Sequence, residues 1–214
     1  TQFVVSPNAE VAVEMDPRTL TRDMIETMAA NGVTRASLGI QDVDPDVQEA
    51  INRVQPLDLI RSAVSSLRDT GIRRISFDLM YGLPLQTDLS VRRTVDTVVS
   101  MDPDRLSVFG YAHVPWMKRH QRLIDMANAA DADGRMAQAD AIADRLEKHG
   151  YQRIGLDHFA RPGDLLTEAQ AAGTLRRNFQ GYTTDTASAL IGLGASAISQ
   201  LQSGYAQNET SIGR

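Results

Sequence analysis

The fold is decided by residues 73–84, Arg-Arg-Ile-Ser-Phe-Asp-Leu-Met-Tyr-Gly-Leu-Pro. Large apolar or aromatic side chains recur at every second position from Ile75 to Tyr81, and a Gly-Leu-Pro turn ends the run. This pattern predicts a buried strand that leads into a turn. Asp78 interrupts it, and a carboxylate is costly to bury without a partner. Asp78 is therefore either a structurally paired residue or one that faces a ligand.

Three other segments repeat the start of this strand. Each begins with Arg, which is followed by an apolar or small residue, then Ser or Gly, then an apolar residue. The three segments are residues 35–38, 105–108 and 153–156. Three of the four segments follow a helix-ending glycine, at Gly32, Gly71 and Gly150. A recurring unit of helix, glycine and Arg-led strand predicts a repeated β/α architecture, and so an α/β fold class.

The segments between these strands predict helices. Helix starts are expected at Thr19 or Thr21, Asp44-Pro45, Pro56 and Thr87, and a firm helix is expected around Met136–Leu146. Residues 116–132 are expected to form a helix and then a connector. Near the end of the chain, residues 175–184 resemble a binding loop, and the small residues of 190–199 predict a strand that another backbone or a ligand can approach closely.

Polar residues gather where the predicted strands end. Parallel β/α folds collect their functional groups at the carboxyl ends of the strands. In this chain those ends carry the following residues: Glu14, Gln41, Asp78, Ala112 with His113, and Asp157 with His158. Some of them could be helix caps or turn formers, but the set as a whole predicts one functional edge.

The composition is that of an ordinary globular protein. The 214 residues are 42% hydrophobic and 23% charged, with a net charge of −5, which favours one domain and disfavours nucleic-acid binding. No apolar run is long enough to cross a bilayer and no signal pattern is present, so a cytoplasmic location without membrane contact is expected. The chain has no cysteine, and so no disulfide, thiolate nucleophile or thiolate metal ligand of its own.

Common catalytic motifs do not explain the functional edge. A dinucleotide fingerprint, a phosphate-binding P-loop and a zinc-protease helix are all missing, and no serine lies in a nucleophile elbow. Asp78, His113, Asp157 and His158 could in principle hold a metal ion, as in hydrolytic or isomerising barrels. Histidines this few are more often hydrogen-bonded structural residues.

Several longer stretches together suggest a family. They are Val13-Glu-Met-Asp-Pro17, Leu38-Gly-Ile-Gln-Asp42, Asn52-Arg-Val-Gln55, Asp78-Leu-Met-Tyr-Gly-Leu-Pro84, Tyr111-Ala-His113, Asp157-His-Phe-Ala-Arg-Pro162 and Arg177-Asn-Phe-Gln-Gly-Tyr-Thr-Thr184. With them, nearly the whole chain resembles the oxygen-independent coproporphyrinogen III oxidases, which are radical S-adenosylmethionine (SAM) enzymes of haem biosynthesis. The resemblance weakens around residues 116–135 and at both ends.

The resemblance implies an activity. Enzymes of this family use a [4Fe-4S] cluster to cleave SAM to a 5′-deoxyadenosyl radical. The radical abstracts hydrogen from propionate side chains of coproporphyrinogen III, and loss of CO₂ and an electron gives protoporphyrinogen IX. The implied protein is a monomeric oxidoreductase that needs an electron donor.

The resemblance also implies binding residues. Two SAM molecules are expected at the matching positions, which are Glu14, Gln41, Arg53, Asp78, Ala112 and Ile198. We add Arg161, Arg176 and Arg177 as candidates for the substrate propionates, because guanidinium groups pair with carboxylates through two hydrogen bonds. Surface solubility is the competing explanation for these three arginines.

One family feature is missing from this sequence. The Cys-x-x-x-Cys-x-x-Cys loop that binds the cluster is absent, as is the glycine-rich SAM segment after it. The expected fold is therefore a partial parallel (β/α) barrel of the radical SAM type that lacks its first strands and the cluster loop. Residues 1–214 are expected to be an incomplete barrel domain, a fragment without the C-terminal domain and inactive alone.

Two other functions stay open. A haem chaperone of the same superfamily would bind tetrapyrroles without decarboxylating them. A metal-dependent barrel hydrolase or isomerase would instead use Asp78, Asp157 and His158. Divalent metal bound in stoichiometric amount would favour the second of these alternatives.

Overall fold

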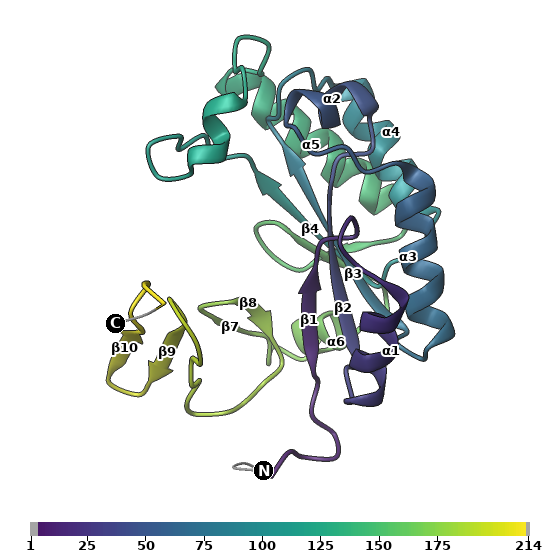
Figure 1. Ribbon diagram of the computed structural model, residues 1–214. Helices are drawn as coiled ribbons and strands as arrows, with labels where there is room; N and C mark the ends of the chain where they lie inside the picture. Colours follow the sequence, from purple (N-terminus) through teal and green to yellow (C-terminus); the bar gives the residue numbers. More distant parts are fainter. Residues whose placement is uncertain (1–3, 213–214) are drawn as a thin grey trace. The chain divides into compact units, whose positions relative to one another are not determined.

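A six-stranded sheet organises the first part of the chain (Figure 1). The computed structural model describes residues 4–212, and the chain divides into a first unit, Thr1–Arg161, and a second unit, Pro162–Arg214. The strand order in the first unit is β1-β2-β3-β4-β6-β5. Strands β1 to β4 are parallel, and β6 pairs antiparallel with both of its neighbours, β4 and β5. The strands are β1 Ala12–Met15, β2 Arg35–Gln41, β3 Arg74–Tyr81, β4 Arg105–Gly110, β5 Gln152–Arg153 and β6 His158–Ala160.

The helices of the first unit join successive strands. They are α1 Arg22–Ala30, α2 Pro45–Ala50, α3 Leu57–Asp69, α4 Asp88–Val99 and α5 Ala132–Lys148, with a 3-10 helix, η1, at Arg119–Leu123. The expected helix starts are confirmed. Thr21, Asp44 and Thr87 each accept a backbone hydrogen bond at the first turn of α1, α2 and α4, and Pro56 precedes α3.

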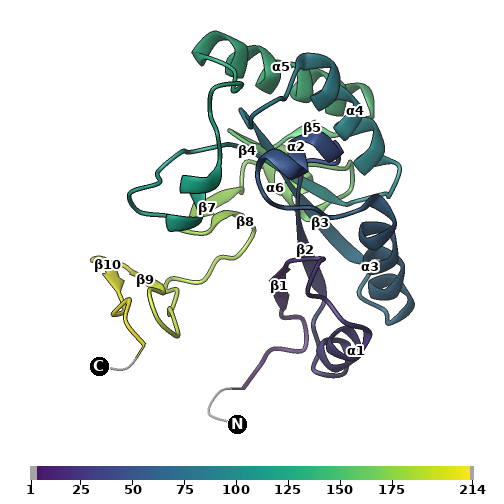
Figure 2. The same cartoon turned by 45° about the horizontal axis from the view of Figure 1, so that its top comes forward.

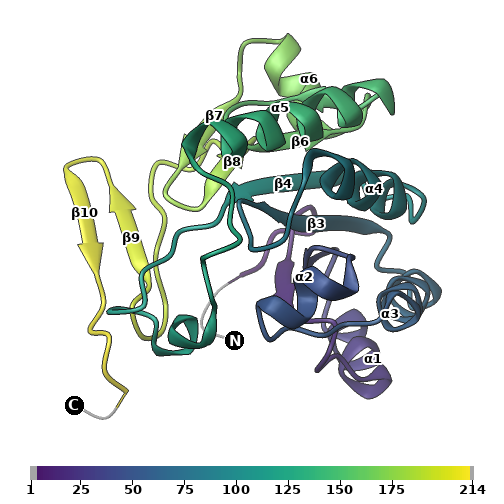
Figure 3. The ribbon, with the colours of Figure 1, turned by 90° about the horizontal axis from the view of Figure 1, so that it is seen from above.

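The hydrophobic core lies between one face of the sheet and the longer helices (Figure 3). Alternate residues of β2 and β3, such as Leu38 and Phe77, point into this core and are completely buried. They pack with helix residues such as Leu67, Val95 and Leu146. The short helix α2 packs Val47 against residues that follow β3 and β4, so it lies at the carboxyl ends of the strands (Figure 2).

The fourth Arg-led segment differs from the prediction. Residues 153–159 do not form one parallel strand, because a bend at residues 155–157 separates β5 from β6. The two strands pair antiparallel to each other, and β6 pairs antiparallel to β4. At the bend, the carbonyl of Asp157 accepts a hydrogen bond from the backbone N–H of Val108 at 2.7 Å. The chain therefore turns back at the sheet edge where a parallel strand was predicted.

Residues 116–132 also differ from the prediction. Apart from η1 this segment consists of turns and irregular backbone, and the regular helix begins only at α5. Gln121 anchors the segment: its side chain accepts a hydrogen bond from Val114 N at 2.6 Å and donates one to the carbonyl of Ala112 at 3.0 Å. These tertiary bonds replace the helical bonds that the sequence pattern suggested.

The second unit contains helix α6, Leu165–Ala171, and two hairpins. The hairpins are β7 Arg176–Asn178 with β8 Gly181–Thr183, and β9 Ile198–Leu201 with β10 Gly204–Gln207. The predicted strand over 190–199 is therefore wrong, although Leu190 bridges Gln200. The predicted close approach is confirmed: a Cβ at Gly192 would lie only 2.8–2.9 Å from backbone atoms of Ile198. Within residues 4–212, no helix is both long enough and apolar enough to cross a membrane.

A buried network of polar side chains holds the carboxyl ends of β2 and β3. Asp42 is fully buried and accepts hydrogen bonds from Asp44 N (2.8 Å), Gln86 Nε2 (2.5 Å) and Thr94 Oγ1 (2.7 Å). Burial raises the pKa of Asp42, and these three donors oppose that rise. Gln48, Gln55, Gln86 and Gln138 extend the network by bonding to backbone groups of the same loops.

We expect Asp42→Ala to lower the free energy of unfolding by about 2–4 kcal/mol, because several buried donors would lose their acceptor. Urea denaturation followed by circular dichroism measures this change. Asp144→Ala, on the exposed side of α5, is the matched control and should alter stability by less than about 0.5 kcal/mol. Equal effects of the two substitutions would contradict a structural role for the network.

A pH-dependent contact joins α4 and α5. Asp96 accepts hydrogen bonds from Arg145 Nε (2.6 Å) and Nη2 (2.8 Å), and it lies 2.7 Å from His149 Nε2. The Arg145 hydrogen bonds are the largest cause that lowers the pKa of Asp96. A lowered carboxyl pKa stabilises the fold above the unfolded-state value of about 3.9, and this stabilisation disappears as the pH falls through the folded-state pKa.

Asp96→Asn should therefore lower stability at pH 7, and the difference from the unsubstituted protein should shrink as the pH falls below about 3.9 and through the lowered folded-state pKa. The effect is expected to be small, because the side chains of Asp96 and Arg145 are 41% and 37% exposed. Unfolding curves across this pH range provide the measurement, with Asp58→Asn at a 97% exposed side chain as control. A difference that persists unchanged at pH 2 would argue against the ion pair.

Candidate functional site

Polar side chains line the sheet face that the core helices leave open. In the strand register, Gly39, Asp78, Ser107 and His158 stand next to one another on β2, β3, β4 and β6. Alternation along each strand sends the neighbouring apolar residues to the opposite, helix-covered face. The same alternation that builds the core therefore also builds this polar row.

Asp78 lies at the centre of the row. Its Oδ2 accepts a hydrogen bond of 3.3 Å from Ser37 Oγ. Burial raises its pKa, and the charge of Glu14 adds to the rise, whereas hydrogen bonds from Ser37 and Ser107 and the charge of His158 oppose it. A half-buried carboxylate with a raised pKa, aimed at an open face, is typical of a binding or catalytic position.

Gln41 lies at a distortion of β2. The register with β3 shifts between Gly39 and Gln41, and Gln41 has a φ of 64°, in the left-handed region that is unfavourable for a side chain. A Cβ at Gly39 would lie 2.8 Å from Gln41 Nε2, so the glutamine side chain passes directly over this glycine. Bulges and strained residues of this kind cluster at functional sites.

Arg53 joins the end of β2 to the end of β1. Its Nη2 donates to the carbonyl of Gly39 at 3.0 Å, and its Nη1 lies 3.1 Å from Asp16 Oδ2. Burial lowers the pKa of Arg53, and the charge of Asp16 opposes this. Hydrogen bonds from Arg18, helped by the charges of Arg53 and Arg18, lower the pKa of Asp16 to about 2. These contacts fix the position of the positively charged Arg53 side chain beside Gln41.

These residues fit a zwitterionic ligand such as SAM. In the described part of the chain, residues 4–212, Gln41 Oε1 and Arg53 Nε are buried without a hydrogen-bond partner, and a bound ligand can supply one. Arg53 can face a carboxylate, and Asp78 or Glu14 can accept from an ammonium or a ribose hydroxyl. The residues do not fit an iron–sulfur cluster, because the chain has no cysteine to supply a thiolate.

Ala112 and His113 follow β4 at the same edge. The carbonyl of Ala112 is fixed by Gln121, as described above, while the Ala112 residue itself is exposed. His113 Nδ1 lies 3.2 Å from the hydroxyl of the buried Tyr111. Ala112 therefore presents an ordered backbone at the functional edge, and His113 is paired with a tyrosine.

Asp157 and His158 lie beside the middle of β4, opposite Ser107 and Val108, because β6 runs antiparallel to β4. The two side chains contact each other, with Asp157 Oδ1 2.6 Å from His158 Nδ1. Across residues 4–212, no group of three or more His, Cys, Asp or Glu side chains is arranged to hold a metal ion. The geometry thus gives no support to a metal centre at Asp78, Asp157 and His158.

Ile198 belongs to the second unit. It lines a hollow of about 390 Å³ together with Phe179, Gln180, Ile191 and Leu193. Three of these side chains are large and apolar, exposed by 59–75% (Phe179, Ile191 and Leu193). Such a lining suits the flat apolar face of an adenine ring.

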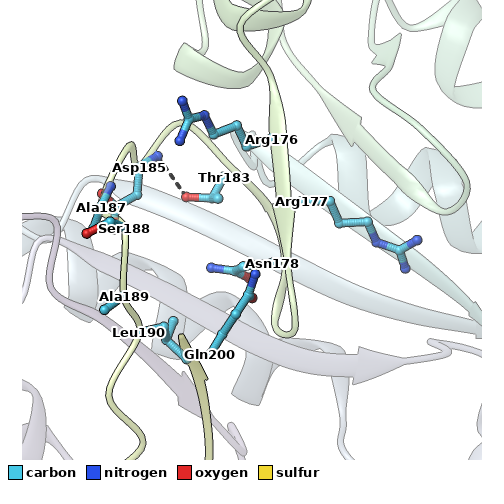
Figure 4. A pocket seen from close by; sticks show the side chains of 10 residues that line it. All are labelled: Arg176, Arg177, Asn178, Thr183, Asp185, Ala187, Ser188, Ala189, Leu190 and Gln200. Carbon is cyan, nitrogen blue, oxygen red and sulfur yellow. Dashed lines mark hydrogen bonds between the residues drawn. The ribbon is translucent and has the colours of Figure 1, made fainter. Parts of the chain in front are cut away.

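The three candidate arginines have different surroundings. Arg161 donates through Nε to Tyr151 OH at 3.2 Å, stacks on that ring and forms an ion pair with Asp102. Its backbone N–H bonds to Asp104, directly before β4 begins, so Arg161 lies at the amino end of β4. This position argues against contact with a ligand at the carboxyl edge. Arg176 and Arg177 lie on hairpin β7–β8 and line a second hollow (Figure 4).

Sequence reasoning missed several residues that the structure adds to the site. Ser37 and Ser107 bond to Asp78, Asp16 holds Arg53, and Gln121 holds Ala112. Serines on a strand and a glutamine in a loop carry no recognisable motif. The strand alternation around Ser37 and Ser107 is the one signal that could have placed them on the open face.

Comparison with known proteins agrees with this geometry. Residues 4–98 match the family model of the Radical SAM superfamily. The chain is 56% identical over 211 residues to the oxygen-independent coproporphyrinogen III oxidase of Bradyrhizobium diazoefficiens, covering 99% of this chain and 47% of that protein. It is 44% identical over 211 residues to the protein of the same name from Paracoccus denitrificans, with the same coverage of 99% and 47%.

A solved structure agrees as well. Coproporphyrinogen III oxidase (HemN) from Escherichia coli, described as a radical SAM enzyme, superposes with a TM-score of 0.91 at 42% identity over 95% of this chain and 47% of that chain. The chain thus spans about half the length of the curated relatives it matches. Its first part is similar to the radical SAM superfamily, and the relatives that nearly the whole chain matches are named oxygen-independent coproporphyrinogen III oxidases.

Proposed function

We propose that this chain is part of a longer enzyme that converts coproporphyrinogen III to protoporphyrinogen IX by oxidative decarboxylation. The observation that carries the proposal is the 56% identity to a coproporphyrinogen III oxidase over 99% of this chain. The polar sheet face with Asp78, Gln41 and Arg53 supports it, because these residues offer the acceptors and the cation that SAM requires.

Radical SAM proteins use SAM together with a [4Fe-4S] cluster, which supply a hydrogen-abstracting 5′-deoxyadenosyl radical when bound. In the proposed enzyme, cysteines outside this sequence hold the cluster. Arg53 pairs with the methionine carboxylate of SAM, and Asp78 and Glu14 accept hydrogen bonds from its ammonium or ribose groups. Gln41 bridges polar groups of the ligand, and Ala112 offers it backbone atoms.

We also propose that two SAM molecules bind. The polar residues of the first unit suit the charged part of one molecule. Ile198 and the apolar hollow around it, in the second unit, suit the adenine of another. Of the two arginines on hairpin β7–β8, Arg176 remains the candidate for a substrate propionate, because Arg177 contacts the Tyr182 ring.

The remaining properties follow from the same proposal. Reductive cleavage of SAM needs an electron donor, and the enzyme is proposed to be a monomer in the cytoplasm. A net charge of −5 gives little attraction to nucleic acid or to anionic membranes.

The proposal is tested with the full-length protein that carries this sequence, reconstituted with iron and sulfide in the absence of oxygen. With SAM, a reductant and coproporphyrinogen III, it should form 5′-deoxyadenosine and protoporphyrinogen IX together. Asp78→Ala and Gln41→Ala should each lower both products by about tenfold or more, as expected when a charge-assisted or buried hydrogen bond is lost. Asp69→Asn, exposed at the end of α3, is the control and should leave both unchanged.

Two results would contradict the proposal. A full-length protein that assembles no cluster is not a radical SAM enzyme. A protein that cleaves SAM but leaves coproporphyrinogen III unchanged is not the oxidase. Haem binding in that second case would favour the chaperone function instead.

The contacts of Arg161 lead to a separate prediction. Arg161→Gln should reduce the free energy of unfolding by roughly 0.5–1.5 kcal/mol, because a cation–π contact and an ion pair are lost. The KM for coproporphyrinogen III should stay within about twofold of the original value, since the arginine supports the amino end of β4. An increase in KM without a loss of stability would instead make Arg161 a substrate-binding residue.

A further inference from the structure

Hairpin β7–β8 has two chemically different faces. Cross-strand partners are Arg176 with Thr183, Arg177 with Tyr182, and Asn178 with Gly181. Because side chains alternate along a strand, Arg176, Asn178 and Thr183 share one face, while Arg177 and Tyr182 share the other. Figure 4 shows the side chains of Arg176 and Arg177 pointing in different directions.

Arg177 already has a partner on its face. Its guanidinium carbon lies 5.5 Å from the centre of the Tyr182 ring, which is the geometry of a cation–π contact. Arg176 differs: within residues 4–212, no hydrogen bond, ion pair or ring contact engages its guanidinium group. The two neighbouring arginines therefore have separate roles.

The side chains on the Arg176 face of the hairpin line a hollow of about 110 Å³. Asn178 and Gln200 line it with side-chain amides, and Gln200 is held in place by paired backbone bonds to Leu190 of 2.8 and 2.9 Å. Asn178 Oδ1 accepts from Gln180 N at 2.9 Å, which leaves its NH₂ group as a donor. One amide atom of Gln200, assigned as Oε1, is buried without a partner.

The charges and donors of this hollow favour an anion. Arg176 brings to this hollow a guanidinium group that no carboxylate among residues 4–212 engages, while the Asp185 carboxylate, which also lines it, accepts a hydrogen bond from Ala187 N at 2.8 Å. A guanidinium group with amide donors matches the two oxygens of a carboxylate. Rotation of the Gln200 amide by half a turn presents its NH₂ to the ligand, since the two orientations differ only in hydrogen bonding.

We propose that Arg176, Asn178 and Gln200 form a binding site for a single carboxylate, and that under the proposed function this carboxylate is a propionate of coproporphyrinogen III. The site has room for a carboxylate and a short alkyl stem but not for a tetrapyrrole ring. Arg177 stiffens the hairpin through Tyr182 and does not contact the ligand. The choice of a propionate as the ligand rests on the proposed function, because the methionine carboxylate of SAM would fit the same groups.

The test titrates the full-length protein with coproporphyrin III, the stable oxidised form of the substrate macrocycle, and follows porphyrin absorbance. Arg176→Gln should weaken binding by about tenfold or more, as expected for loss of a charge-assisted pair. Arg177→Gln, the matched control on the opposite face, should change it by less than about twofold. Arg176→Lys should recover only part of the affinity, because lysine keeps the charge and loses the two-pronged geometry.

A second variant and a second ligand make the test sharper. Gln200→Glu places a negative charge in the hollow at nearly constant volume. It should abolish the contribution of Arg176 to the binding of coproporphyrin III. Binding of the coproporphyrin tetramethyl ester, which lacks free carboxylates, should be insensitive to Arg176→Gln. Circular dichroism of each variant verifies that the fold is retained.

Each other outcome overturns a defined statement. The carboxylate site would be overturned if Arg176→Gln and Arg177→Gln weakened coproporphyrin III binding equally. It would also be overturned if Arg176→Gln weakened binding of the tetramethyl ester as much as binding of coproporphyrin III. A higher Kd for SAM with unchanged coproporphyrin binding would overturn the propionate and assign the site to SAM. If the unsubstituted protein decarboxylates the substrate but Arg176→Gln has no effect, only this inference fails. If the unsubstituted protein neither binds coproporphyrin nor forms product, the proposed function fails.

Discussion

The functional edge depends on one buried carboxylate. Asp42 follows β2 and receives hydrogen bonds from its own loop, from the loop after β3 through Gln86, and from α4 through Thr94. These bonds satisfy a charge that would otherwise be too costly to bury. They also fix the point where β2 leaves the sheet, directly after the strained residue Gln41. The geometry of the candidate binding face is therefore maintained from beneath by side chains that are buried.

The two faces of the sheet have a division of roles. On one face, residues such as Leu38 and Phe77 pack with helices and supply hydrophobic stabilisation of about 1.5–3 kcal/mol for each large buried side chain. On the other face, Asp78 and its serine partners remain half-buried and polar. The packed core behind Asp78 keeps its carboxylate partly buried, and this burial raises its pKa. The side chains that stabilise the fold and those of the candidate site therefore lie on opposite faces of the same strands.

Arginine has three distinct uses in this chain. Arg53 is half-buried at the functional edge, where it bonds to a strand carbonyl and a carboxylate. Arg161 stacks on Tyr151 and supports the amino end of β4. Arg176 stands in a small hollow with amide donors. Composition alone cannot distinguish these uses, because the surroundings of each guanidinium group determine what it binds.

The sequence by itself determined the β/α order as far as β4, the alternating strand β3 and the helix caps. These features are local: a threonine cap or an alternating strand is specified within a few residues, as for Thr87 and residues 75–81. Family resemblance added the positions that we propose to bind SAM. Only the tertiary structure decided that β6 turns back antiparallel, that Gln121 holds Ala112, and that Arg176 and Arg177 face opposite ways. Those outcomes depend on contacts between residues distant in sequence and on strand register, and no local pattern encodes either of them.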